Sequence, residues 1–164
     1  MANGTEPVPD LVVRPIEPAD TGRLLAMFHR LSAETIYRRF FTLLPSPPPA
    51  ALRRLVTVDH HDREALVAVH DTDIVAVARW DRIAAGSPEA EIAVVVEDAW
   101  QHRGLGHFLM RRLVTEAAQH GITFLTASVL TDNRPAMRLA QAIARPSTVE
   151  FNGPETKLGF ALAS

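Results

Sequence analysis

The stretch VVVEDAWQHRGLGHFLMRRL, residues 94–113, decides the fold of this chain. It opens with three β-branched valines, passes through an acidic and aromatic turn, and reaches two closely spaced glycines. An amphipathic helix follows at once, because apolar residues recur at helical spacing on one face: Leu105, Phe108, Leu109, Leu113 and Ala117. The stretch therefore predicts a buried strand, a glycine turn and a helix in direct succession.

The two glycines stand where the first N–H groups of a helix lack partners and carry the positive end of the helix dipole. Gly104 and Gly106 remove side chains there, so that a phosphate can reach those N–H groups. His102, Arg103 and His107 add positive character nearby. On the glycines alone, a tight strand-to-helix turn without any ligand is an equally open interpretation.

Two familiar phosphate-binding motifs do not fit this turn. The dinucleotide fingerprint requires a third glycine, but position 109 is leucine. The P-loop requires a Gly-Lys-Ser/Thr sequence, and no lysine occurs in this stretch.

Composition narrows the class of protein. The 164 residues are 47% hydrophobic and 22% charged, which predicts one globular domain over residues 11–164 after a loose tail at 1–10. A net charge of −2 argues against a nucleic-acid binder, and the absence of cysteine excludes disulfides and thiolate metal sites. No apolar run is long enough for a membrane span, and the N-terminus lacks secretory features, so we expect a cytoplasmic protein.

The predicted elements alternate between strands and helices. We expect helices capped by Asp20 and Ser32, helices over residues 50–58 and 104–120, and a helix after Asn133. Strands are expected at residues 11–16, 65–69, 74–80, 89–96, 122–130, 148–151 and 157–162. Because hairpins lie next to crossover helices, the order favours a mixed α/β fold over a doubly wound parallel sheet.

A family resemblance follows from these motifs. Residues 101–106, QHRGLG, resemble the Gln/Arg-x-x-Gly-x-Gly/Ala signature of the GCN5-related N-acetyltransferases (GNAT), and they lie between strand and helix as in that family. Residues 132–141, DNRPAMRLAQ, resemble the family's later helix with its leading asparagine. The resemblance implies a mostly antiparallel, twisted sheet of about six to seven strands, flanked by helices.

The resemblance also implies acetyl-CoA as the donor. The backbone at residues 94–96 would pair with pantetheine amides, residues 102–107 would hold the diphosphate, and Asn133 would reach the pantetheine while capping its helix. The predicted cofactor residues are Val94, Val95, Val96, Gln101, His102, Arg103, Gly104, Leu105, Gly106, His107 and Asn133.

Glu91 is the predicted general base. Strand alternation places Glu91, Ala93 and Val95 on one face, and a carboxylate in an otherwise apolar strand is expected to lie in low-dielectric surroundings. The N–H of Val95 or Val96 would polarise the thioester carbonyl. The alternative is that Glu91 lies at a solvated strand edge, while Glu97 and Asp98 are expected on the solvent side of the turn.

Some residues depart from the family pattern. The helix after Asn133 has no tyrosine to protonate the thiolate, and the single tyrosine, Tyr37, belongs to the early helices. The helix ends in Ala144-Arg145-Pro146 instead of a glycine and an aromatic residue. The adjacent His60 and His61 point in different directions, so no metal is predicted.

The acetyl acceptor stays open between two classes. Residues 31–41, LSAETIYRRFF, and the block around Glu91 resemble bacterial Pat-type protein-lysine acetyltransferases, here as a free-standing module. A protein lysine or a small-molecule amine is therefore expected as partner, with no nucleic acid and no membrane. The alternative function is an acyl-CoA-binding regulatory or interaction module without efficient turnover. An open sheet edge is compatible with a homodimer.

Overall fold

The structure is a computed structural model that describes residues 10–163 of the chain. Residues 1–9, most of the predicted N-terminal tail, and residue 164 lie outside the described residues.

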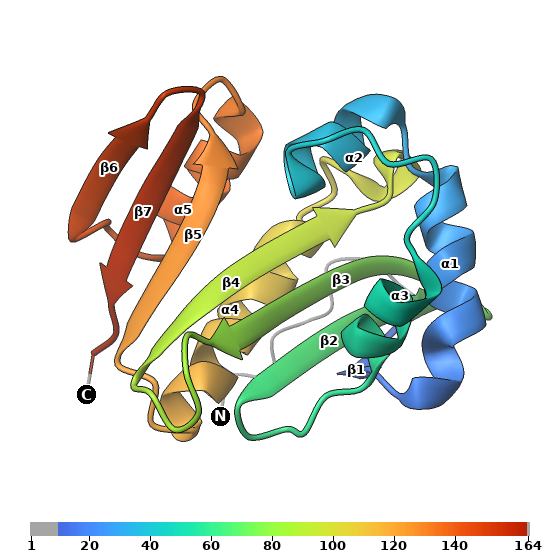
Figure 1. The fold of residues 1–164 in the computed structure, drawn as a ribbon, viewed down its shortest axis with the longest axis horizontal. Helices are drawn as coiled ribbons and strands as arrows, with labels where there is room; N and C mark the ends of the chain where they lie inside the picture. The colour runs from blue at the N-terminus through green and yellow to red at the C-terminus, as the bar shows by residue number, and fades with distance from the viewer. Residues whose placement is uncertain (1–9, 164) are drawn as a thin grey trace.

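A seven-stranded sheet with the order β1-β2-β3-β4-β5-β7-β6 forms the centre of the molecule (Figure 1). Its strands are β1 (Leu11–Pro15), β2 (Arg63–His70), β3 (Asp73–Arg82), β4 (Glu89–Val96), β5 (Phe124–Leu130), β6 (Thr148–Asn152) and β7 (Glu155–Ala161). All neighbouring pairs are antiparallel except β4 and β5, which run parallel. The prediction of a mixed, mostly antiparallel sheet is confirmed.

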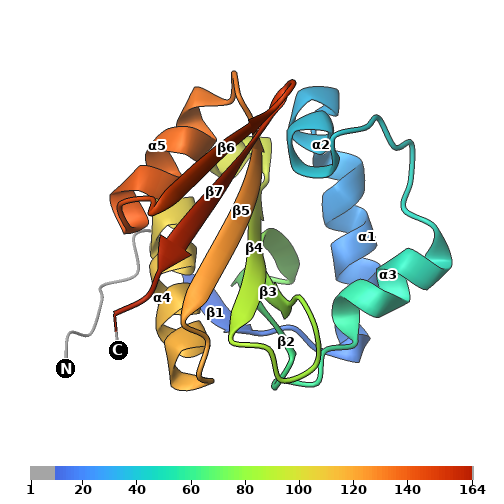
Figure 2. The same ribbon diagram turned by 60° about the vertical axis from the view of Figure 1, so that its left-hand side comes forward.

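Helices cover both faces of this sheet (Figure 2). One face carries α1 (Thr21–Arg30), α2 (Ala33–Phe40) and α3 (Pro49–Val56), and the other carries α4 (Leu105–Gln119) and α5 (Arg134–Ile143). Two single 3₁₀ turns, η1 (Pro18–Asp20) and η2 (Asp98–Trp100), precede α1 and α4. Each face has its own apolar core because side chains alternate along the strands.

The predicted alternation of β4 is observed. Ile92, Val94 and Val96 pack in the core beneath α4, whereas Val95 packs in the core beneath α1 and α2. Glu91 shares the face of Val95, on the side of α1, α2 and α3.

Of the two predicted helix caps, Ser32 and Asp20, only Ser32 makes the cap hydrogen bond. Ser32 caps α2 by accepting a hydrogen bond from the Thr35 N–H at 3.1 Å, as expected. Asp20 occupies the N-cap position of α1, but its carboxylate makes no cap hydrogen bond. The side chain is instead buried and binds the guanidinium of Arg14, because two 2.7 Å hydrogen bonds satisfy a buried carboxylate better than one helix N–H.

Among residues 10–163, no helix combines the length and apolar character needed to span a bilayer.

Candidate active site

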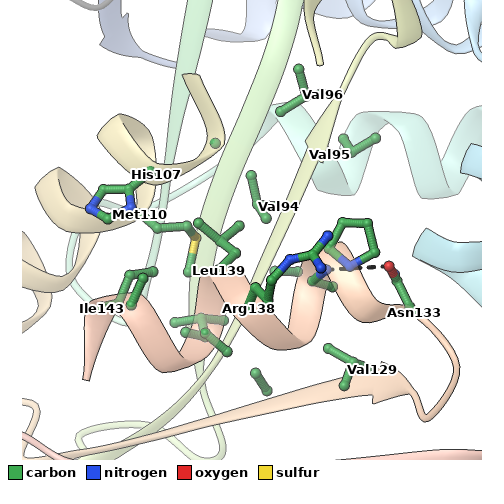
Figure 3. Close-up of a pocket in the computed structure, with 18 of the residues that line it drawn as sticks. Val94, Val95, Val96, His107, Met110, Val129, Asn133, Arg138, Leu139 and Ile143 are labelled. Atoms are coloured by element: carbon green, nitrogen blue, oxygen red, sulfur yellow. Dashed lines mark hydrogen bonds between the residues drawn. The ribbon is translucent and has the colours of Figure 1, made fainter. Parts of the chain in front are cut away.

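The parallel strands β4 and β5 separate after a short contact. Their pairing extends only from Glu89 to Glu91 on β4, opposite Phe124 to Thr126 on β5. The two strands lie close at one end and diverge towards the other (Figure 1). A pocket of about 540 Å³ occupies the region beyond the pairing, between the valines of β4 and the side chains of α5 (Figure 3).

The backbone of β4 faces this opening at alternate residues. The Ile83 N–H donates to Glu89, and the Glu97 N–H donates to Val75, at the two ends of an unbroken β3–β4 register. Because hydrogen-bonded pairs alternate in an antiparallel ladder, Val95 directs its N–H and C=O to β3.

Val94 and Val96 therefore direct their backbone polar groups towards the opening. We restrict the expected pairing with pantetheine amides to these two residues, since the polar groups of Val95 are used by β3. At Val96 the carbonyl already accepts a hydrogen bond from Gln101, which leaves its N–H for the ligand. The same geometry removes the Val95 N–H as a donor to the thioester carbonyl. Val94 is the available donor nearer to Glu91 along the strand.

The glycine turn adopts a special backbone conformation at the start of α4. Gly104, the N-cap residue, has a φ of 81°, and His102 has a φ of 61°, which is uncommon for a residue with a side chain. The first bond of the helix runs from the Phe108 N–H to the Gly104 carbonyl. The N–H groups of residues 102–107 make no hydrogen bond to any group within residues 10–163.

These free N–H groups and the glycines fit a diphosphate. Gly106 borders the pocket, and a Cβ there would lie 3.5 Å from Leu139 and 3.6 Å from Val96. Any larger side chain would therefore project into the space between α4, α5 and β4. The turn can donate several hydrogen bonds at the positive end of a helix dipole, which suits a diphosphate.

The side chains of the turn play different parts. His102 and His107 line the pocket, and Leu105 is buried beneath the helix. Arg103 does not line the pocket; its guanidinium lies 4.9 Å from the ring centroid of Trp100. Only the backbone of Arg103 is therefore placed for the predicted contact.

Gln101 binds the protein itself. Its side-chain amide donates to the Val96 carbonyl at 2.9 Å and to the Thr35 hydroxyl at 3.3 Å. The first residue of the signature thus ties the end of β4 to the turn and to α2. Gln101 also lines the pocket, so its contact with the cofactor stays a prediction beside this structural role.

Asn133 caps α5 with the oxygen of its side-chain amide. Its Oδ1 accepts a hydrogen bond from the Ala136 N–H at 3.3 Å (Figure 3). The residue is buried and lines the pocket, and its Nδ2 makes no hydrogen bond within the described residues. The Nδ2 group is therefore available to a ligand, in keeping with the predicted double role.

Glu91 lies in charged surroundings. Its side chain is exposed and lines the pocket, and its direct partner across β3 is Asp81. Arg39 of α2 lines the same pocket, and its charge is coupled to both carboxylates. The low-dielectric environment expected for Glu91 is wrong, because the residue is exposed and lies among charged groups.

Glu97 does not face solvent, contrary to the expectation, whereas Asp98 is exposed as expected but hydrogen-bonded to the start of α2. Glu97 is largely buried and pairs with Arg30 of α1 at 3.0 Å. Asp98 accepts hydrogen bonds from the Ser32 N–H at 3.0 Å and the Ser32 hydroxyl at 2.7 Å. Burial acts to raise the pKa of Asp98, but the bonds from Ser32 and Thr35 outweigh it and hold that pKa below its usual range. These contacts join the early helices to the glycine turn.

Several pocket residues escaped the sequence analysis. Thr35, Arg39, Ser128 and Arg138 line the pocket, from α2, β5 and α5. No local sequence signal marks them, because segments far apart in the chain bring them together at the pocket. Tyr37, by contrast, is exposed on α2 and does not line the pocket.

The two adjacent histidines each pair with a carboxylate. His60 Nδ1 lies 2.7 Å from Glu64, and His61 Nδ1 lies 3.0 Å from Asp62. Within residues 10–163, no group of three or more side chains is arranged to hold a metal ion.

Comparison with known families decides what kind of fold this is. The model of the acetyltransferase (GNAT) family matches residues 30–143, which include the diverging strands, the glycine turn and α5. The chain belongs to the GNAT family.

Named GNAT proteins resemble this chain over most of its length. Acetyltransferase Pat of Mycolicibacterium smegmatis is 38% identical over 128 residues, covering 77% of this chain. This chain spans only 38% of that relative's length.

Solved GNAT structures share the same architecture. The GNAT domain of S. lividans PAT superposes with a TM-score of 0.84 at 32% identity, covering 92% of this chain and 89% of that one. The structure of yncA from Salmonella typhimurium, solved with its cofactor acetyl-CoA, has a TM-score of 0.75 over 94% and 95% of the two chains. At 17% identity the yncA likeness concerns the fold alone.

The predicted family is thereby confirmed, together with the Pat-type resemblance. At the level of the family, the prediction of an N-acetyltransferase with acetyl-CoA as donor is confirmed as well. The individual residue roles, the acceptor, the homodimer and the cytoplasmic location stay predictions.

Proposed function

We propose that this chain transfers the acetyl group of acetyl-CoA directly to a primary amine, of a protein lysine or a small molecule. The observation that carries the proposal is the alignment of three features in one pocket: the free N–H groups at the start of α4, the backbone of Val94 and Val96, and the carboxylate of Glu91. Together they match the diphosphate, the pantetheine and the reacting amine of such a transfer.

The diphosphate would bind the N–H groups of residues 102–107, with Asn133 Nδ2 at the pantetheine. The pantetheine would then lie along β4 as an added strand, and its amides would pair with Val94 and Val96. This arrangement directs the thioester along β4 towards Glu91. Holding the thioester and the amine together contributes up to about 7–11 kcal/mol of barrier reduction.

In the chemical step, the amine nitrogen bonds to the acetyl carbon as the carbon–sulfur bond breaks. Glu91 would accept the proton that the nitrogen loses, directly or through one water molecule, and sulfur would leave as the thiolate of CoA. The N–H of Val94 would stabilise negative charge on the carbonyl oxygen. Glu91 lies where the pairing of β4 with β5 ends, and its exposed side chain on the face of α1, α2 and α3 would be reached by an acceptor from that face.

A specific observation favours a second candidate, an acyl-CoA-binding module without efficient turnover. The chain's single tyrosine does not line the pocket, so no tyrosine is placed to protonate the thiolate there. Both candidates require the same binding site for acetyl-CoA. They differ only in whether an amine accelerates the release of CoA.

The deciding experiment measures steady-state CoA release from acetyl-CoA against a panel of lysine peptides, polyamines and amino acids. Acceptor-dependent release, with the acetylated amine identified by mass spectrometry, is the result expected for the enzyme. Saturable acetyl-CoA binding without acceptor-dependent release would favour the binding module. At one hundred times its dissociation constant, acetyl-CoA is expected to stabilise the fold by about 2.7 kcal/mol in either case.

A further inference from the structure

A second cavity lies beneath the early helices, on the face of the sheet that carries Glu91. It has a volume of about 250 Å³. Its walls are mainly apolar and come from α1, α2, α3 and the two central strands, among them Leu24, Phe28, Phe40, Leu52, Leu55 and Val77.

A buried guanidinium with an unused donor group lines this apolar cavity. Arg79 of β3 is 5% exposed, and its Nε donates to Asp81 at 3.1 Å. Its Nη1 makes a long contact of 3.4 Å to the Leu55 carbonyl, and its Nη2 is buried without a partner within the described residues. Leaving a buried charged donor unsatisfied is more unfavourable than leaving a neutral one unsatisfied, so the position favours an added acceptor.

Arg39 of α2 brings a second guanidinium to the same cavity. Burial and the charge of Arg79 lower the pKa of Arg39 to about 10, against the opposing effect of Glu91 and Asp81. Asp81 is already shared between Arg79 and Arg63, which it meets at 2.7 Å. The carboxylates of Glu91 and Asp81 therefore face three guanidinium groups, those of Arg39, Arg63 and Arg79. One more anion would relieve the repulsion between Arg39 and Arg79.

The chemistry of the cavity selects one class of anion. A guanidinium matches the planar, two-oxygen shape of a carboxylate, and apolar walls suit a hydrocarbon group attached to it. Phosphate or sulfate would keep most of its hydration shell and gain nothing from these walls.

We propose that Arg39 and Arg79 form a carboxylate-binding subsite for the acceptor, and that the acceptor is an apolar α-amino acid. The cavity and the active-site pocket meet at Arg39, Ala93 and Val95, which line both. One carbon separates the amine of an α-amino acid from its carboxylate. The carboxylate on the two arginines therefore keeps the amine at this junction, beside the Glu91 pocket, while the apolar side chain fills the cavity.

The acceptor role rests on the proposed acetyl transfer, whereas the subsite itself can be tested without turnover. The binding test compares 3-phenylpropanoate with 3-phenylpropanamide by calorimetry, since the two differ only in the carboxylate. The subsite predicts at least tenfold tighter binding of the acid. Equal affinities, or no detectable binding of the acid at millimolar concentration, would overturn the subsite.

Two variants assign the binding to the arginines. R79M and R39Q are each expected to weaken the binding of 3-phenylpropanoate at least tenfold. Neither variant is expected to change the binding of 3-phenylpropanamide. R53Q is the matched control, because Arg53 is exposed on α3 and lines neither cavity. If R79M does not fold, the comparison of R39Q with R53Q on the folded protein decides, and unchanged acid binding in R39Q would contradict the proposal.

The acceptor test compares L-phenylalanine, L-phenylalaninamide and a lysine peptide as acetyl acceptors. The amide has the less basic amine and the larger neutral fraction at neutral pH, so only carboxylate recognition predicts a higher kcat/KM for the free amino acid. If 3-phenylpropanoate binds but no acceptor is acetylated, the result would support the subsite and contradict the proposed transfer. A lysine peptide or the amide acetylated as fast as the free amino acid would overturn the assigned acceptor class.

Discussion

The side-chain amide of Gln101 donates a hydrogen bond of 2.9 Å to the carbonyl oxygen of Val96. This bond closes the turn between β4 and α4, and the Thr35 hydroxyl holds the same amide from α2. The residue that opens the family signature therefore holds the turn in place, and it also lines the pocket.

Replacing Gln101 tests this positioning role. Q101L removes two hydrogen bonds, each worth about 1 kcal/mol, and is expected to weaken acetyl-CoA binding about five- to thirtyfold. Calorimetric titration measures the change, with Q119L on the exposed end of α4 as control. An unaltered dissociation constant in Q101L would show that the turn holds its conformation without this side chain.

The two glycines of the turn should respond differently to alanine. Because Gly104 has a φ of 81°, G104A is expected to lower the free energy of unfolding by about 1–2 kcal/mol. At Gly106 a Cβ meets its neighbours only at 3.5 Å and 3.6 Å, so G106A should retain full stability. Urea denaturation of both variants checks the contrast, and equal losses would contradict it.

A long side chain at Gly106 should block the ligand. G106L extends from α4 into the space bordered by Leu139 and Val96, where the pantetheine is proposed to lie. We expect acetyl-CoA to lose most of its thermal stabilisation of this variant, while G22L on α1, with open space around it, keeps the full shift. Full stabilisation of G106L by acetyl-CoA would place the ligand elsewhere.

Glu91 is expected to act on transfer and not on donor binding. E91Q should bind acetyl-CoA like the parent protein but acetylate at least about tenfold more slowly, the lower end of general-base effects. E89Q is the matched control, because Glu89 is exposed on the same strand and does not line the pocket. Equal turnover of E91Q and the parent protein would remove Glu91 from the mechanism.

Low pH should lower the stability of the fold, because the carboxylate of Asp20 becomes protonated. Hydrogen bonds from Arg14 lower the pKa of this carboxyl from 3.8 to about 2, against the effect of burial and with help from the Glu17 N–H and Arg23. Because the unfolded chain binds the proton more readily, the stabilisation is present above about pH 4 and lost as the pH falls towards 2.

The variant D20N isolates this contribution. It is expected to lower the free energy of unfolding by about 2 kcal/mol at pH 7, with the difference from the parent protein shrinking between pH 4 and pH 2. Urea denaturation across this range measures it, and D73N, at an exposed strand start, is the control. A pH-independent difference would assign the loss to packing instead of charge.

The sequence predicted the elements that depend on local pattern. Valine alternation in residues 94–96, the cap at Ser32 and the glycine turn all follow from periodicity and backbone preference, and the structure has them. What it could not predict are relations between distant segments. Glu97, Asp98 and Gln101 each have a partner in the early helices, more than sixty residues away in the chain.

The environment of Glu91 was mispredicted for the same reason. An apolar strand sequence indicated apolar surroundings, but the Glu91 side chain is exposed, and Asp81 on β3 adds a charge opposite. The buried Arg79 likewise gives no local signal, because its cavity is assembled from three helices and two strands.

The central claim is that bare backbone N–H groups of the turn bind the diphosphate of CoA. A crystal structure of this chain with acetyl-CoA tests it most directly. We expect diphosphate oxygens within about 2.7–3.2 Å of several amide nitrogens between Arg103 and His107. A diphosphate held elsewhere, with those nitrogens turned away or bonded to other protein groups, would contradict it.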